Sequence, residues 1–201
     1  MTHATLLHQQ RLETVLQVLK KSGAKSVLDL GCGEGVLIEK LASIDQFENI
    51  TGIDICETSL QRARQRLEEN HACVPDHVHI KTGSFTKADN DLRGFHAAVM
   101  VETIEHIDPD KLSTIENAVF SDLRPDMVII TTPNSDYNPL LGVPDHRMRH
   151  PDHRFEWGMK KFRNWCNGVA GRNGYDVDFR HIGGAHPRYG GPTQIAIFKV
   201  A

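Results

Sequence analysis

The sequence lacks the marks of several large protein classes. It has 4 cysteines in 201 residues and no C-x-x-C pair, so neither a structural zinc site nor a disulfide framework is expected. It also has no secretory segment and no apolar run approaching the roughly 20 residues that cross a bilayer. These absences predict a cytoplasmic protein with reduced thiols and no membrane contact.

The chain has no strong excess of charge of either sign. Lysine and arginine number 23 against 26 aspartates and glutamates, which gives a formal net charge of -3. A general basic coat for nucleic acid is therefore excluded, and any contact with nucleic acid must come from a local patch. Hydrophobic residues make up 39% of the chain, enough for one substantial core, so we expect a single domain over residues 1–201.

What the sequence does contain is an alternation of helix and strand patterns. The spacing of apolar residues predicts helices over 6–19, 36–41, 57–69, 111–123 and 158–170. Short apolar runs predict strands over 26–30, 50–55, 77–81, 95–101, 127–132, 176–182 and 193–200. This order favours an α/β fold whose mostly parallel sheet has helices on both faces and an antiparallel pair at its edge. Residues 133–157 show no period, and a loop of that length is usually functional or disordered.

A glycine-rich turn follows the first predicted strand. In VLDLGCGEG, the glycines Gly31, Gly33 and Gly35 separate strand 26–30 from helix 36–41. Such a turn lets the backbone approach a ligand and directs the first amides of the helix toward it. Glycines alone do not distinguish a methyl donor from the pyrophosphate of a dinucleotide, which oxidoreductases hold on a related turn.

Two acidic residues decide between these ligands. Asp29 precedes the turn, where a carboxylate would repel a pyrophosphate but suits the ammonium group of S-adenosylmethionine. Asp54, in ITGIDI after the next strand, can accept hydrogen bonds from both hydroxyls of an adenosine ribose. Together with Gly31 and Gly33, these residues resemble the signature of class I S-adenosylmethionine-dependent methyltransferases, whose Rossmann-like sheet has seven strands. In that fold Ser84 would lie beside the adenine ring.

A second group of polar residues follows strand 95–101, at the end of the sheet where such folds bind ligands. Glu102, Glu105 and His106 have helical spacing and together can supply three ligands to a divalent cation. A solvated helix start would also place glutamates here, but it leaves the histidine unexplained. The long loop offers a fourth ligand in His146, His150 or His153.

Four segments then carry a family resemblance. ETIEH, TTPNSDYNPL, RHPDHRFEW and GGPTQIAIF resemble the RNA 3′-terminal 2′-O-methyltransferases of the HUA-enhancer type, over almost the whole chain. The resemblance implies metal-dependent methyl transfer from S-adenosylmethionine to the 2′-hydroxyl of the last nucleotide, in RNA-mediated gene silencing or RNA repair. It also implies that the metal ligands and catalytic residues are Glu102, Glu105, His106 and His153.

The last of these segments is more similar to the bacterial, RNA-repair branch of the family. Members of that branch usually carry an N-terminal region that joins them to a kinase-phosphatase-ligase subunit, which is thus an expected partner of the full-length protein. One departure from the family pattern is Gly158, where threonine is common. The change removes a hydroxyl cap from the following helix but no proposed ligand.

The chemistry of an RNA 3′ end gives a reason for a metal site with these four ligands. Only the last nucleotide has adjacent free 2′ and 3′ hydroxyls, so a cation that chelates both would select the terminus and activate the 2′ oxygen. Two imidazoles beside two carboxylates favour manganese, with magnesium as an alternative ion. Arg147, Arg149 and Arg154 of the long loop would contact RNA phosphates.

Three ring-bearing residues lie close to these motifs. Phe155 and Trp157 can stack on a terminal base, although core packing is expected of at least one of them. His186, in the glycine-rich segment GGAHPRYGGPTQ, would border the acceptor site.

Two other functions stay open at this point. A metal-dependent O-methyltransferase of a small vicinal diol, such as a catechol, would use the same chelation but does not account for RHPDHRFEW. A non-catalytic partner subunit would hold the donor or the metal without turnover. Such a protein is expected to have lost one of the two motifs, and here both are intact.

Overall fold

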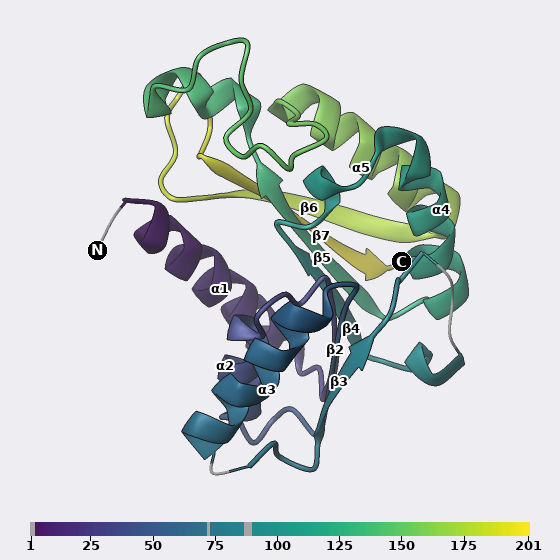
Figure 1. Ribbon diagram of the computed structural model, residues 1–201. Helices are drawn as coiled ribbons and strands as arrows, with labels where there is room; N and C mark the ends of the chain where they lie inside the picture. Colours follow the sequence, from purple (N-terminus) through teal and green to yellow (C-terminus); the bar gives the residue numbers. More distant parts are fainter. Residues whose placement is uncertain (1–2, 72, 87–89) are drawn as a thin grey trace.

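Seven strands form one sheet in the computed structural model, which describes residues 3–71, 73–86 and 90–201 (Figure 1). The strands are β1 (Ser26–Leu30), β2 (Asn49–Asp54), β3 (Val78–Thr82), β4 (Ala97–Val101), β5 (Met127–Pro133), β6 (Tyr175–Ile182) and β7 (Thr193–Val200). Their order across the sheet is β3-β2-β1-β4-β5-β7-β6. Strands β1 to β5 run parallel, whereas β7 is antiparallel to both of its neighbours. The expected mostly parallel sheet is therefore confirmed.

The antiparallel pair expected at the end of the chain is also present. Residues 183–192 connect β6 to β7 and are too few for the helical crossover that a parallel pair requires. Strand β7 pairs on its other side with β5, so it lies inside the sheet. Strand β6 is consequently left at the rim.

Helices cover both faces of the sheet. Figure 1 shows α1 (His3–Ser22), α2 (Val36–Ala42) and α3 (Glu57–His71) on one face, and α4 (Leu112–Glu116) and α5 (Met159–Asn173) on the other. Each layer buries its own apolar cluster. In α3, for example, Leu60, Ala63 and Leu67 are buried at the spacing of one helix face. Among the described residues, none of the helices combines the length and apolar character needed to cross a bilayer.

Several shorter helical segments connect these elements. They are η1 (Asn90–Leu92), η2 (Ile104–His106), η3 (Pro109–Lys111), η4 (Asn117–Leu123) and η5 (Ser135–Leu141). The helix predicted over 111–123 is divided, because α4 widens at Asn117 into the π-helical turns of η4. Arg124 then adopts a left-handed conformation with φ of 46°, and Pro125 follows. Apolar spacing does not distinguish α from π turns, since both bury a similar face.

The long loop 133–157 is more ordered than its sequence indicates. It contains η5, which begins after Asn134, and the Asn134 side chain accepts a hydrogen bond from the Asp136 amide at 3.1 Å. Asn134 also forms a backbone bridge with Trp157. The two ends of the loop therefore meet where β5 ends.

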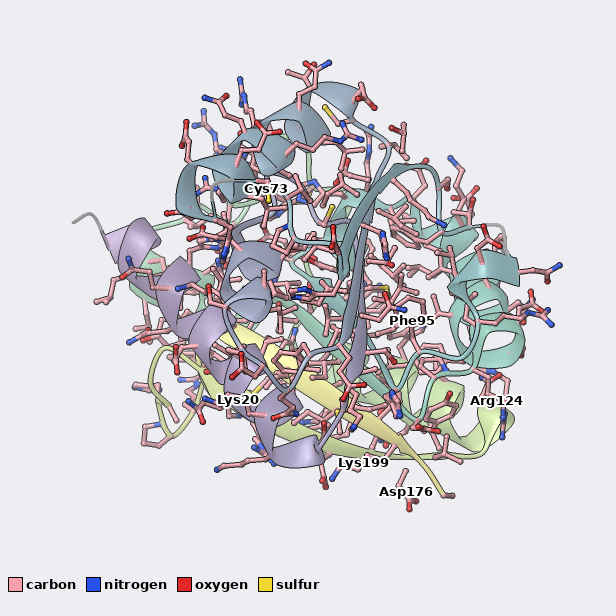
Figure 2. All side chains as sticks on the ribbon, turned by 90° about the horizontal axis from the view of Figure 1, so that it is seen from below. Lys20, Cys73, Phe95, Arg124, Asp176 and Lys199 are labelled. Carbon is pink, nitrogen blue, oxygen red and sulfur yellow. The ribbon has the colours of Figure 1, made fainter. Side chains whose placement is uncertain are left out.

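All of the predicted site segments follow the carboxyl ends of parallel strands. These ends share one edge of the sheet, as the parallel pairing requires. Figure 2 looks at the molecule from below, where Phe95, Arg124 and Asp176 mark the amino ends of β4, β5 and β6. The site therefore lies at the other end of these strands.

Candidate functional site

The glycine turn after β1 is held against β2 in a conformation that requires glycine. The amides of Gly31 and Cys32 both donate to the Ile53 carbonyl, at 2.8 and 3.0 Å. Gly31 has φ of 83°, and a Cβ atom there would lie 2.5 Å from Cγ2 of Thr103. Gly33 has φ of 52° with open space beside it. The backbone at Gly33 is therefore accessible to a ligand from the open side of the turn.

Two carboxylates stand beside this turn. Asp54 accepts hydrogen bonds from the Gly33 amide at 2.9 Å and from the Cys56 amide at 2.8 Å, and each oxygen keeps a lone pair free. Asp29 is only 3% exposed. Its burial and the nearby charge of Asp54 raise the pKa of Asp29 to about 7. A cationic ligand group beside Asp29 would offset the free-energy cost of ionising this buried carboxyl group.

Two adjoining cavities are lined by the five residues predicted to bind the methyl donor, Asp29, Gly31, Gly33, Asp54 and Ser84. One, of about 470 Å³, is lined by Asp54, Ser84 and His106 among others. The second, of about 340 Å³, is lined by Asp29 and Gly33. Gly31 and Glu102 line both cavities, so the two meet between the glycine turn and the end of β4.

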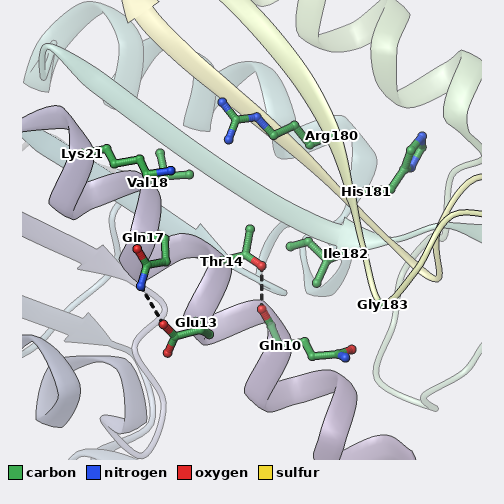
Figure 3. A pocket seen from close by; sticks show the side chains of 10 residues that line it. All are labelled: Gln10, Glu13, Thr14, Gln17, Val18, Lys21, Arg180, His181, Ile182 and Gly183. Atoms are coloured by element: carbon green, nitrogen blue, oxygen red, sulfur yellow. Dashed lines mark hydrogen bonds between the residues drawn. The ribbon is translucent and has the colours of Figure 1, made fainter.

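Another cavity, of about 410 Å³, lies between α1 and β6 (Figure 3). Its lining contains none of the predicted donor or metal residues. Some of its polar side chains satisfy one another, since Gln17 donates to Glu13 at 2.9 Å and the Thr14 hydroxyl donates to the Gln10 carbonyl at 2.7 Å. It is therefore separate from the candidate active site.

Three of the four predicted metal ligands converge beside the larger donor cavity. Ligand atoms of Glu105, His106 and His153 all lie within 4.8 Å of one another. The Arg154 amide donates to the Glu105 carbonyl at 2.7 Å and so holds the long loop against η2. His150 lies next to this group, with its ring 5.6 Å from that of His153. Among the described residues, the compact cluster includes His153 rather than His150.

The electrostatics of this cluster fit a divalent cation. Glu105 is fully buried, and its Oε2 accepts from the Thr132 hydroxyl at 3.0 Å, but its Oε1 has no hydrogen-bond partner in the described part of the chain. Burial and the nearby Glu102 charge raise the pKa of Glu105 well above its usual value. Desolvation and the rings of His153 and His150 lower the pKa of His106. A buried carboxylate oxygen without a partner, beside two imidazole rings, is what a cation site requires.

The fourth predicted ligand, Glu102, is engaged elsewhere. Its Oε2 lies 3.1 Å from Nη2 of Arg11, and its Oε1 accepts from the Thr131 hydroxyl at 3.0 Å. Burial raises the pKa of Glu102, and the ion pair with Arg11 opposes that shift. Its backbone is left-handed with φ of 53°, a strained conformation of the kind that clusters at functional sites. Glu102 stays a predicted ligand, and Arg11 is a residue that the sequence did not reveal.

Glu156 is a second residue that the sequence reading missed. Its Oε1 lies 2.6 Å from Nδ1 of His153 and accepts from the Arg149 amide at 2.6 Å, while its Oε2 accepts from Asn138 at 2.8 Å. Burial alone would raise the pKa of Glu156, but the bonds from His153 and Asn138 hold it below its usual value. An ionised Glu156 accepts the Nδ1 proton and leaves Nε2 of His153 free for a metal. The sequence feature that could have identified Glu156 is its position three residues after His153.

The loop arginines differ in what they can reach. Arg147 and Arg154 are exposed. Arg149 is half-buried, and its guanidinium donates to Asn138 at 2.6 Å, to the Pro192 carbonyl at 2.7 Å and to the Asn134 carbonyl. We therefore carry only Arg147 and Arg154 forward as phosphate contacts, because the protein itself occupies the guanidinium of Arg149.

Neighbouring residues of the loop have structural roles. Phe155 and Trp157 are both buried and stack on each other with ring centroids 4.3 Å apart, so the core role expected of at least one applies to both. At Gly158, a side chain would overlap the carboxylate of Asp136. That carboxylate accepts from the Met159 amide at 2.9 Å. Asp136 thus caps α5 in place of the missing threonine hydroxyl.

Comparisons with known proteins agree with this geometry. A family model described as a methyltransferase domain matches residues 27–126. The small RNA 2′-O-methyltransferase of Gallus gallus is 36% identical over 96% of this chain, which spans 53% of that protein. The Arabidopsis thaliana protein of the same name is 30% identical over 96% of this chain, which spans 22% of it.

A solved bacterial structure matches the chain from end to end. The methyltransferase domain of bacterial CtHen1-C has a TM-score of 0.87 and 40% sequence identity, covering 97% of this chain and 99% of that one. The chain thus spans about half or less of these curated relatives but nearly all of a bacterial Hen1 methyltransferase domain. This chain therefore belongs to the Hen1-type family of small RNA 2′-O-methyltransferases.

Proposed function

We propose that this chain transfers a methyl group from S-adenosylmethionine to the 2′-hydroxyl of the 3′-terminal nucleotide of RNA, at a metal-dependent site. The observation that carries the proposal is the meeting of the two donor cavities at Gly31 and Glu102, beside the cluster of Glu105, His106 and His153. The relatives named small RNA 2′-O-methyltransferase support the choice of acceptor. We also propose that residues 1–201 act as one catalytic domain.

The donor would span both cavities. Asp29, which lines the smaller cavity, would pair with the ammonium of the methionine part, and Asp54, which lines the larger one, would accept hydrogen bonds from the ribose hydroxyls. Ser84 lines the same cavity as Asp54 and would contact the adenine. Gly31 lines both cavities, so the sulfonium would lie against its backbone.

The acceptor end would be held by a divalent cation on Glu102, Glu105, His106 and His153. A cation held by these residues would supply Lewis-acid chemistry that lowers the pKa of the 2′-hydroxyl, and it would favour an end with two adjacent hydroxyls. Mixed nitrogen and oxygen ligands favour manganese, and magnesium is the alternative. Binding the cation would require the Glu102 carboxylate to turn from Arg11 toward the other ligands.

The protein residues then act mainly by positioning. Glu156 orients His153, and Thr132 orients Glu105, so the ligands meet in one place before the substrate arrives. The exposed Arg147 and Arg154 would neutralise the last phosphates of the RNA. As the new O–C bond forms, the C–S bond of the sulfonium breaks and the hydroxyl proton passes to solvent.

The deciding experiment compares synthetic RNAs that differ only at their last ribose. We expect methylation of an RNA with free 2′ and 3′ hydroxyls, and none when the end is 2′-deoxy or carries a 3′-phosphate, because one chelating oxygen is missing or blocked. Transfer to a catechol but not to RNA would favour the small-diol enzyme. Donor binding without transfer to either acceptor would favour a non-catalytic subunit. RNA repair together with a kinase-phosphatase-ligase subunit is the setting we propose for this reaction.

A further inference from the structure

The loop between β6 and β7, residues 183–192, is fixed to the acceptor side of the site. Asn134, directly after β5, donates from its side chain to the Tyr189 carbonyl at 2.8 Å and to the Gly191 carbonyl at 2.9 Å. Arg149 donates to the Pro192 carbonyl at 2.7 Å. The loop is therefore attached to the same segment that contains His153.

The tip of this loop is held in one conformation. The amides of His186 and Gly190 each donate to the carbonyl of the other, at 2.7 and 2.8 Å. Gly190 has φ of 66°, and a Cβ atom there would lie 2.6 Å from the His181 ring and 2.7 Å from the Met159 sulfur. These contacts fix the loop tip as a small closed turn.

This turn presents two rings and a guanidinium, which we call the loop platform: His186, Arg188 and Tyr189. The rings of His186 and Tyr189 stack with centroids 4.9 Å apart and an angle of 26°. The Arg188 guanidinium lies 5.2 Å from the centre of the Tyr189 ring. His186 and Arg188 are exposed, and residues 183–192 include no acidic residue. The platform is thus both aromatic and cationic.

The platform is connected through β7 and Arg11 to Glu102. Thr193 begins β7, and its hydroxyl accepts from Nε of Arg11 at 2.8 Å, while Nη2 of Arg11 lies 3.1 Å from Glu102. Tyr189 precedes Thr193 by four residues, a stretch that spans at most roughly 14 Å. This span is short enough for a strand whose last ribose lies near Glu102 to contact the platform as well.

We propose that the loop platform binds a nucleobase just inside the 3′ end of single-stranded RNA, with Arg188 pairing with an adjoining phosphate. Unpaired bases are held by stacking on aromatic rings and on arginine planes, and the phosphates by cationic side chains. The idea rests on the proposed function and extends it, because it assigns recognition of the strand to a segment other than the long loop.

The test measures binding of fluorescently labelled, unstructured RNA by anisotropy. A series of RNAs has a single abasic nucleotide at successive positions before the terminus. With the unchanged protein, one position is expected to weaken binding by about 5-fold or more, the loss of one stacked base. Tyr189→Ala is expected to bind intact RNA that much more weakly and to lose its sensitivity to the abasic position, while Tyr189→Phe retains it.

Matched controls lie outside the site. His79→Ala and Arg93→Ala remove an exposed imidazole and an exposed guanidinium elsewhere and should leave RNA affinity unchanged, whereas His186→Ala and Arg188→Ala should lower it. Melting curves check that each variant folds. If the unchanged protein binds every abasic RNA as tightly as the intact one, the platform is wrong, whether or not the variants fold. Methyl transfer to RNA, measured separately, tests the proposed function by itself.

Discussion

At the scale of single residues, the site depends on buried charges that are given specific partners. Within the residues that the structure describes, Glu105 has one oxygen without a hydrogen bond, while Glu156 receives three hydrogen bonds and so stays ionised. The difference matters because an unpaired buried carboxylate favours a cation, whereas a fully bonded one orients its neighbour. Glu105 is therefore our proposed ligand and Glu156 our proposed positioning residue.

Replacing Glu156 by glutamine tests this assignment. Glu156→Gln removes the negative charge that fixes the Nδ1 proton of His153, and we expect manganese affinity to fall by about 10- to 100-fold. Calorimetry on the protein without RNA gives the affinity directly. Glu48→Gln, an exposed carboxylate paired only with Lys25, is the matched control and should have no effect. Equal manganese affinity in Glu156→Gln and the unchanged protein would contradict the positioning role.

Asp29 predicts how donor binding depends on pH. The pKa of Asp29 is raised to about 7 by burial and by Asp54, and a cationic ligand favours the ionised form, so binding should lower that pKa and release a proton. Affinity for S-adenosylhomocysteine, which keeps the ammonium, is expected to be about tenfold weaker at pH 6 than at pH 8. Calorimetry in buffers of different ionisation enthalpy measures the proton. Asp29→Asn should bind weakly at both pH values, and a persistent tenfold change in that variant would place the titrating group elsewhere.

At the scale of elements, the acceptor site depends on loops that are fastened to the sheet and to one another. Asn134 joins the end of β5 to both the long loop and the loop 183–192. Asp136, in η5, caps α5 at Met159. Segments far apart in sequence are thereby held as one wall of the site.

The α5 cap gives a stability prediction for this wall. Asp136→Ala should lower the free energy of unfolding by about 0.5–2 kcal/mol, because the Met159 amide loses its acceptor. In a Gly158→Thr background the same change should cost less, because it removes the carboxylate that the new side chain would overlap and lets the threonine hydroxyl cap the helix. Denaturant unfolding of the two single variants and the double variant measures the coupling. Strictly additive costs would show that the two residues do not share the cap.

At the scale of the whole molecule, cation binding should be linked to folding. Two segments, η2 and the long loop, contribute ligands, so a bound cation holds together parts of the fold that separate on unfolding. The two proposed donor cavities share Glu102, and the cluster of Glu105, His106 and His153 is the proposed metal site at the same edge of the sheet. Ligand binding is therefore expected to stabilise the whole fold.

This linkage can be measured without RNA. Manganese at a hundredfold excess over its dissociation constant should raise the melting midpoint by roughly 5–10 °C, magnesium should do so less, and a chelator should reverse the shift and abolish methyl transfer. His153→Ala is expected to lose the shift, whereas His150→Ala, outside the compact cluster, should keep it. The reverse pattern would show that His150 is the ligand.

The order of strands and helices, the glycine turn with Asp29 and Asp54, and the closeness of Glu105 to His106 could be predicted from the sequence. Glu102, predicted as part of the same group, contacts Arg11 instead. Each of the predicted features depends on residues that lie close together in the sequence. Such local patterns are the periodic spacing of apolar residues, glycines in a turn, and polar residues at short intervals. The resemblance to known methyltransferases supplied His153 as the further ligand, and the long loop lies against η2 in the way that this choice needs.

Only the tertiary structure decided the partners of these residues. Arg11 meets Glu102 across more than ninety positions of chain, and Arg149 turns inward to Asn134 and Pro192 instead of outward. Neither contact could be predicted from neighbouring residues in the sequence. A charged side chain in a helix or loop is expected to be solvated unless the segments that pack against it are known. The unpaired oxygen of Glu105 has the same origin, because burial and the absence of a partner arise when separate segments pack together.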